Sequence, residues 1–167
     1  YVTNNQDRLD TREASGRVET EFTNSDLFSV VYTDSFERLV RPFPIAAGVT
    51  LPIGSYGFHT TRIGYVGGQQ RPYSGEVVYE FGTFYNGDRK SIALNSARLQ
   101  VTPQVSLEPS FSVNWVDLVQ GSFIAKVART RATYTITPRM FVSGIVQYNS
   151  AGSSFGSNVR FRWEYRP

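Results

Sequence analysis

The sequence predicts an all-β protein in which about nine strands follow one another in an antiparallel meander. The first observation behind this prediction is that apolar and polar residues alternate with a period of two at short intervals along the chain, as they do in half-buried strands. The second is that no segment keeps a 3.6-residue helical period. The third is that the connections between these segments carry turn-forming Asn, Gly, Asp and Pro.

The predicted strands are the alternating segments, taken in order. They span residues 14–22, 27–37, 55–66, 73–85, 89–101, 104–116, 122–136, 139–149 and 157–167. The last is the clearest, because it alternates without interruption between an apolar set and a polar set. The apolar set is Val159, Phe161, Trp163 and Tyr165, and the polar set is Asn158, Arg160, Arg162, Glu164 and Arg166. Such a strand lies between an apolar and an aqueous environment.

The connections fall into two length classes. Tight turns are predicted at Asn24-Ser25-Asp26, Asn86-Gly87-Asp88, Thr102-Pro103 and Thr137-Pro138. Longer connections are predicted at residues 39–54, 117–121 and 149–156. In a meander all three longer connections share one end of the sheet and both Thr-Pro turns share the other, although the short Asn86 turn lies with the long connections. Short turns at one end and long loops at the other are typical of outer-membrane barrels.

Composition excludes several classes of protein. The 167 residues include no cysteine, one histidine and one methionine, which excludes disulfide frameworks, zinc clusters and thiol chemistry. The net charge of +3 is mild and the basic residues are spread along the strands, so nucleic acid is not an expected partner. No apolar run approaches the roughly 20 residues of a membrane helix, whereas a membrane-spanning strand needs only about 9–11 residues, half of which can be polar.

Two faces are predicted for the sheet, one apolar and one polar. The apolar, lipid-facing set is Val105, Leu107, Phe111, Val113, Trp115, Val159, Phe161, Trp163 and Tyr165. The polar, lumen-facing set is Glu76, Glu80, Glu108, Arg129, Arg131, Arg160, Arg162 and Glu164. Alternation alone does not decide between lipid and a soluble core, because a soluble barrel places the same apolar residues inside.

The position of the aromatic residues favours lipid. Rings on the apolar face lie near strand ends, at Trp115, Tyr85, Tyr148, Tyr73, Tyr134 and Tyr165. Strand centres carry Val, Ala, Phe and Gly, and amphipathic rings prefer the headgroup level of a bilayer. Pro109 interrupts the pattern and predicts a bulge or break in its strand, because proline removes a ladder donor.

The order and spacing of four stretches resemble a known family. They are FPI at residues 43–45 with LPIGSY at 51–56, GTFYNGDR at 82–89, VQYN at 146–149, and SNVRFRWEYRP at 157–167. Over roughly residues 10–167 the chain resembles the C-terminal region of bacterial proteins of the domain of unknown function 5916 (DUF5916) family. The resemblance implies a large outer-membrane barrel, preceded in the full-length protein by an N-terminal sugar-binding-like domain.

The same resemblance implies that this chain is part of a longer protein. Family members continue beyond the match to Arg166-Pro167 with a hydrophobic strand and a final strand that ends in an aromatic residue. An odd count of nine strands fits an incomplete barrel, because bacterial barrels have even numbers. We expect residues 1–12 to be a linker and residues 13–167 to be an incomplete C-terminal portion of the barrel, with outer-membrane lipid and the remainder of the barrel as partners.

No catalytic, metal-binding or cofactor-binding residue is predicted. Glu76 and Glu80 lie about 13 Å apart along one strand, too far for a glycosidase pair, and Glu19 with Glu21 fits an exposed acidic strand end better. His59 has no nucleophile elbow or metal motif near it. The oxygens of Asn4, Asn5, Asp7 and Asp10 fit a solvated linker better than a calcium loop. The polar face is either a lining that binds an anionic solute or sugar, or an ion-paired wall, and the wall is the commoner arrangement.

The leading hypothesis is therefore a non-enzymatic segment of a bacterial outer-membrane barrel, used for solute or carbohydrate-related transport or for surface anchoring. One alternative is a soluble all-β barrel or sandwich whose inward aromatic residues enclose an apolar ligand. The other is a membrane anchor for a hydrolase whose active site lies upstream of Tyr1.

Overall fold

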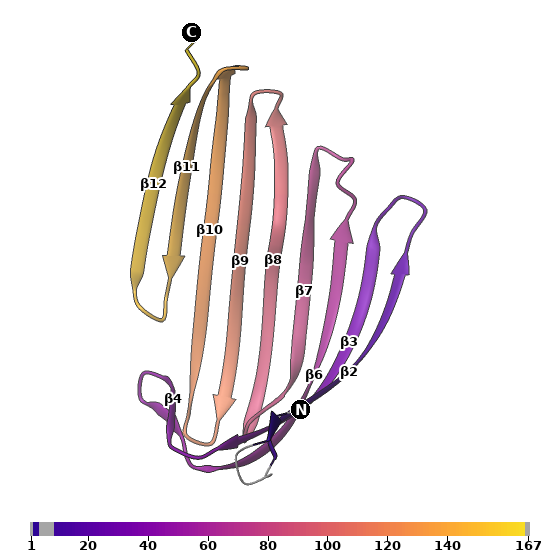
Figure 1. Cartoon of the computed structure of the whole chain (residues 1–167), viewed down its shortest axis with the longest axis vertical. Coiled ribbons are helices and arrows are strands. Elements are labelled where there is room, and N and C mark those ends of the chain that lie inside the picture. The colour runs from indigo at the N-terminus through magenta and orange to yellow at the C-terminus, as the bar shows by residue number, and fades with distance from the viewer. Residues whose placement is uncertain (1, 4–8, 166–167) are drawn as a thin grey trace.

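The computed structural model describes residues 2–3 and 9–165 (Figure 1). One antiparallel sheet of ten strands runs through the molecule, and its spatial order follows the chain except for an inserted hairpin, β4–β5, between β3 and β6. The sheet strands are β1 (Val2–Thr3), β2 (Leu9–Glu21), β3 (Leu27–Leu39), β6 (Gly54–Gly67), β7 (Tyr73–Phe84), β8 (Gly87–Thr102), β9 (Val105–Leu118), β10 (Gly121–Thr137), β11 (Met140–Asn149) and β12 (Ser154–Trp163). The hairpin is β4 (Phe43–Ala46) and β5 (Val49–Leu51).

The all-β class and the nine-strand meander predicted from the sequence are confirmed. Each predicted strand corresponds to one long strand, β2, β3 and β6 to β12, and each pairs antiparallel with its neighbour in the chain. Strand β2 begins at Leu9, so residues 9–12, expected in a linker, are already paired with β3 or lead into that pairing. The described residues include no helix that is long and apolar enough to cross a membrane.

The inserted hairpin was not predicted. The prolines at positions 44 and 52 explain why the sequence did not indicate these two strands, because proline is disfavoured within strands. It turns at Ala47-Gly48, where Gly48 has a φ of 78°, a conformation that glycine adopts without a steric penalty. We call the end of the sheet where this hairpin lies the hairpin end; Figure 1 shows it at the bottom, beside the β9–β10 turn.

The predicted segregation of loop lengths is wrong in two places. Strands β9 and β10 are joined by only residues 119–120, because their backbones keep pairing up to Leu118 and Gly121 regardless of the polar side chains there. The β11–β12 connection is only residues 150–153. At the opposite end the β6–β7 connection is longer, residues 68–72. At the hairpin end, only the 40–53 connection, which contains the hairpin, is longer than the connections at the opposite end.

The bulge predicted at Pro109 lies in the neighbouring strand instead. Strand β9 is continuous, and Pro109 keeps its place opposite Thr130 of β10. On its other side the β8 register shifts between Leu94 and Leu99, so residues 95–98 have no partner on β9. Because proline has no N–H to donate, β8 moves out of register beside it, and Ser96 takes a φ of 49°.

No second layer covers the sheet in the described part of the chain. The accessible surface is 11402 Å², whereas a compact monomer of this size exposes about 8,300 Å². The one cluster of buried apolar side chains is Val49, Leu51, Val116 and Leu118, where the hairpin packs on the end of β9. Over most of the sheet, therefore, no other described segment packs on either face.

Candidate functional site

The strand register places the predicted apolar residues on one face of the sheet. Directly opposed residues share a face, and the row Phe111, Ala128, Tyr148, Phe155 runs from β9 to β12 through such pairs. Alternation along β9 and β12 then brings in Val105, Leu107, Val113, Trp115, Val159, Phe161 and Trp163. Tyr165 lies just beyond β12 with its ring 5.6 Å from that of Trp163. Arg166, the last residue of the predicted polar set, lies outside the described residues.

This face is exposed over its whole width, and it is mainly apolar, although toward the hairpin end of β2 and β3 it carries the Arg12–Asp34 ion pair. The two tryptophans of the chain both lie on it and are 43% (Trp115) and 59% (Trp163) exposed. The same face carries exposed large side chains on every strand from β2 to β12, including Val18, Phe28, Tyr65, Val77 and Ile124. No described segment packs against it.

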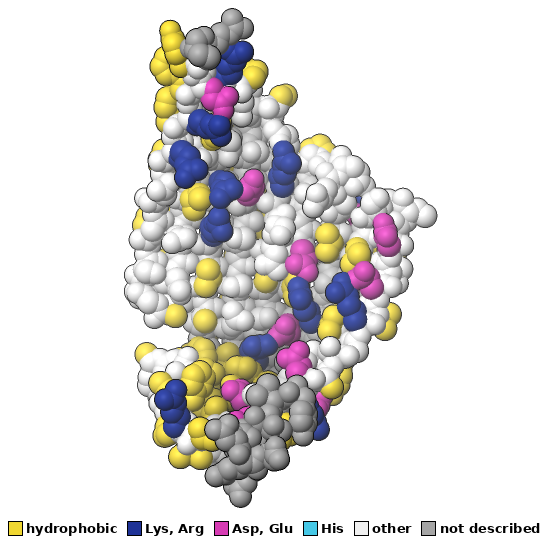
Figure 2. Space-filling view, in the orientation of Figure 1, with side chains coloured by type: hydrophobic (Ala, Val, Ile, Leu, Met, Phe, Trp, Pro, Cys, Tyr) yellow, Lys and Arg dark blue, Asp and Glu magenta, His cyan; other side chains and the backbone are white. Residues whose placement is uncertain are grey.

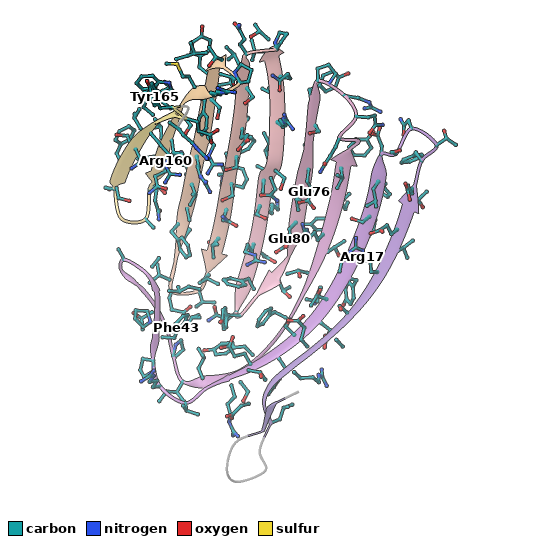
Figure 3. All side chains as sticks on the ribbon, turned by 45° about the horizontal axis from the view of Figure 1, so that its top comes forward. Arg17, Phe43, Glu76, Glu80, Arg160 and Tyr165 are labelled. Carbon is teal, nitrogen blue, oxygen red and sulfur yellow. The ribbon has the colours of Figure 1, made fainter. Side chains whose placement is uncertain are left out.

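The opposite face is polar, and it brings together all eight residues predicted for it. Figure 2 shows the charged side chains across this face, and Figure 3 labels Glu76 and Glu80 on β7 and Arg160 on β12. Six of the eight form ion pairs. The pairs are Arg62–Glu76 at 2.8 Å, Arg89–Glu80, Arg131–Glu108 at 3.5 Å and Arg162–Glu164 at 2.5 Å. Arg129 and Arg160 form none among the described residues.

At the hairpin end this polar face becomes apolar. The hairpin residues Val49 and Leu51 pack there on Val116 and Leu118, and aromatic rings extend the contact. Tyr56 and Tyr85 meet edge to face at 5.3 Å, and the Phe58 and Phe84 rings lie 5.8 Å apart. The hairpin therefore fills one end of the space in front of the polar face.

Tyr85 corrects one sequence prediction. Alternation placed it on the apolar face, but it lies in the β7–β8 turn with a φ of 52°, which breaks the alternation. Its ring packs against the hairpin cluster, and its hydroxyl donates a 2.7 Å hydrogen bond to the Glu37 carboxylate. Burial and this hydrogen bond raise the pKa of Tyr85 above its usual value.

A buried carboxylate joins two connections at the opposite end of the sheet. Asp26, only 2% exposed, accepts hydrogen bonds from the Tyr65 hydroxyl at 2.5 Å and the Gly68 backbone N–H at 2.8 Å. The Arg71 guanidinium donates a third bond at 3.0 Å. The hydrogen bonds from Tyr65 and Gly68, and the charge of Arg71, lower the pKa of Asp26 to about 2. The carboxylate thus fixes the 68–72 connection to the β2–β3 turn.

We expect the Asp26 contacts to be lost at low pH. Because the pKa of Asp26 is about 2 in the folded state against 3.8 unperturbed, its stabilising effect is complete above pH 3.8 and disappears as the pH falls through about 2. Asp26→Asn should therefore speed hydrogen exchange of the Gly68 amide at neutral pH, and should remove most of the change in exchange protection between pH 4 and 2.

Asp34→Asn is the matched control for this experiment. Asp34 also pairs with an arginine, Arg12, at 2.8 Å, but its side chain is 46% exposed and it lies toward the hairpin end of β3, away from the 68–72 connection. If the two variants change Gly68 exchange equally, Asp26 does not hold the connection.

Both lysines of the chain lie on the apolar face, near Trp115. Lys90 is directly opposite Trp115 on β8, and Lys126 on β10 is opposite Val113. A groove of about 950 Å³ opens here, lined by Phe81, Lys90, Trp115 and Ile124 and by the polar residues Asp88 and Asp117. Sequence reasoning did not single out these lysines, although their parity with Trp115 would have placed them on this face.

The residues weighed for chemistry are held in structural contacts. The His59 ring stacks near Tyr32 at 6.0 Å and lies 3.3 Å from the Thr83 hydroxyl. Glu19 pairs with Arg17. Within the described ranges no three His, Cys, Asp or Glu side chains gather as a metal site. The calcium candidate depends on Asn4, Asn5 and Asp7, which lie outside these ranges.

The fold defines a class of protein, an all-β chain built on one large antiparallel meander sheet. The β4–β5 hairpin covers one end of the polar face, and no described segment covers the apolar face. No protein-family model, no curated protein and no solved structure matches the chain. Function is therefore inferred from the residues of the two faces.

Proposed function

We propose that this chain is a non-enzymatic segment of a bacterial outer-membrane β-barrel, with its apolar face toward lipid and its polar face toward an aqueous lumen that small solutes cross. The observation that carries the proposal is the exposed apolar face, which spans the sheet without a covering layer. Soluble monomers rarely expose apolar patches larger than a few hundred Å². Contact with lipid acyl chains would remove an apolar surface of this extent from water.

The dimensions of the apolar face support a bilayer. On β9 it extends from Val105 to Trp115, ten residue steps or about 34 Å along the strand. With a strand tilt of about 40°, this row covers about 26 Å of bilayer, close to the apolar band of outer-membrane barrels. Asp117 follows directly on the same face, where the strand would leave the bilayer.

Side chains suited to a lipid interface lie at the ends of the apolar face. Trp115 has Lys90 beside it, and Lys126 follows on the next strand close to the β11–β12 turn. Tryptophan is enriched at the headgroup level, and lysine can extend its ammonium group there from an apolar stem. Trp163 and Tyr165 lie at the other end of the face.

The polar face supports a water-filled lumen. It combines paired charges with Ser and Thr side chains such as Ser110, Ser112 and Thr133, and the hairpin restricts the space at one end. We infer that further strands of the same barrel pair with the outer edge of β12, because that edge carries backbone groups that have no partner strand in the described sheet and unpaired backbone groups are costly in lipid.

Intrinsic tryptophan fluorescence tests the proposal directly. Both tryptophans of this chain, Trp115 and Trp163, lie on the apolar face. In the full-length protein, with any tryptophan outside this chain replaced by Phe, their emission in vesicles should be quenched by lipids with brominated acyl chains. Iodide in the aqueous phase should have little effect on it. The comparison of the two quenchers is the measurement.

Trp115→Phe isolates Trp163 and tests each end of the face separately. A control places the reporter on the other face: in a variant with both native tryptophans replaced by Phe, Ser112→Trp should respond to iodide but not to brominated lipid. If iodide quenches Trp115 and Trp163 while brominated lipid does not, the apolar face meets water or a protein partner, and the membrane proposal is wrong.

A further inference from the structure

The polar face holds a groove of about 390 Å³ beside the β8 bulge, between β7 and the pair β9–β10. Its floor forms where residues 95–98 leave the β9 register opposite Pro109. Ala97 packs closely over Gly75 of β7, where an added Cβ would come within 3.0 Å of the Ala97 Cα. The groove is thus a local feature of the bulge, and its volume is within the range of small-molecule sites.

The charges that line this groove are unbalanced. Arg98, Arg129 and Arg131 line it together with a single carboxylate, Glu108. Glu108 contacts Arg131 at 3.5 Å, and both side chains are partly exposed. Arg98 contacts the Gln100 side-chain oxygen at a long 3.4 Å, and the Arg129 side chain donates to no group in the described part of the chain. The groove therefore has two positive charges in excess, and Arg129 has unused donors.

The surroundings of the groove strengthen this positive charge. Beyond the groove, the polar face carries Arg160 and Arg162 on β12 and Arg89 on β8, the last paired with Glu80, against one further carboxylate, Glu164, just after β12. The other half of the same face, from β2 to β7, carries two arginines, Arg17 and Arg62, against six glutamates: Glu13, Glu19, Glu21, Glu37, Glu76 and Glu80. Dark-blue side chains accordingly gather at the upper left of Figure 2, over β10 to β12.

Arginine pairs in this geometry suit acidic groups. Arg129 and Arg131 are two residues apart on β10 and share a face, so their backbones are about 7 Å apart. Each planar guanidinium can donate two parallel hydrogen bonds to a carboxylate or phosphate. The partial pairing of Arg131 with Glu108 is exposed and weak, so an incoming anion can replace it.

We propose that this groove binds the carboxylate or phosphate group of a small anionic solute, with Arg129 and Arg131 as the main ligands and Arg98 at the rim. The inference deepens the proposed function, since it names the class of solute for the polar face, and it depends on that function for the aqueous route to the groove. Glu108 opposes the solute by its charge and lowers its affinity.

Calorimetric titration of the full-length protein in detergent micelles tests the proposal, with citrate and inorganic phosphate as separate probes at low ionic strength. Saturable binding of either anion is expected, and the preferred one identifies the acidic group. Arg129→Gln and Arg131→Gln should each weaken binding about 10- to 100-fold, the loss of one or two charge-assisted hydrogen bonds. Glu108→Gln should strengthen it several-fold, a gain that misfolding does not produce.

Arg62→Gln is the matched control, because Arg62 lies on the same face but is paired with Glu76 outside the groove. Its affinity should equal that of the wild type. Absence of saturable binding, or an equal loss in the Arg62 and Arg129 variants, would overturn the proposal. Binding in micelles needs no bilayer, and the tryptophan experiment needs no anion, so failure of either proposal is visible separately.

Discussion

Phe111→Arg is expected to lower the free energy of unfolding of the full-length protein in vesicles by about 2–4 kcal/mol, the cost of an arginine on the lipid face of a barrel near the bilayer centre. Phe111 is near the middle of β9, and its direct neighbours across the strands are Leu94 and Ala128. No carboxylate lies among these neighbours to pair with a new guanidinium. Urea-induced unfolding in large vesicles, followed by tryptophan emission, measures the loss.

Ser112→Arg is the control, since it places the same side chain one residue further along β9 on the polar face. Its direct neighbours are Ala93 and Val127, and the guanidinium can reach water from there. We expect a change within about 0.5 kcal/mol, as for most surface substitutions. Equal effects of the two substitutions would mean that both faces meet the same environment, which contradicts a lipid-facing Phe111.

Period-two alternation was sufficient to predict the nine long strands, because each strand has one apolar and one polar side and side chains alternate strictly along a strand. The same pattern assigned residues such as Glu108 and Arg131 to one face, and the structure brings these two together as a pair. Alternation failed at Tyr85, where a positive φ in the turn reverses the direction of the side chain. Backbone conformation at a turn is not visible in a hydropathy pattern.

Contacts between segments that are far apart in the chain could not be predicted from the sequence. Asp26 reads as a turn residue, and its partners Gly68 and Arg71 are more than forty positions away. The hairpin core is similar, because Leu51 meets Leu118 only after the 40–53 connection folds across the polar face. The sequence predicted that Pro109 would cause a bulge, because proline cannot donate a ladder hydrogen bond. It did not predict that the bulge would form in the neighbouring strand β8.

Leu51→Ala should have the largest local effect in the chain. Leu51 is fully buried, at 0% exposure, in the one apolar cluster of the described residues, against Val49, Val116 and Leu118. Removing its side-chain carbons should cost about 2–5 kcal/mol, through lost burial and the cavity that remains. The cost should fall on the hairpin, because the long strands keep their backbone pairing without it. Hydrogen exchange of the amides in residues 43–51 should become at least about 30-fold faster, while exchange in the centres of β8 to β10 should not change.

Ile53→Ala is the control within the same segment, because Ile53 is 62% exposed and its loss should change exchange little.

The Leu51→Ala variant also tests the role of the hairpin in the lumen. If the hairpin narrows the solute route, Leu51→Ala should raise the single-channel conductance of the full-length protein in planar bilayers, because the detached hairpin leaves the polar face open at that end. An unchanged conductance together with faster hairpin exchange would mean that the hairpin lies outside the route. In that case the narrowest part of the lumen lies elsewhere along the polar face.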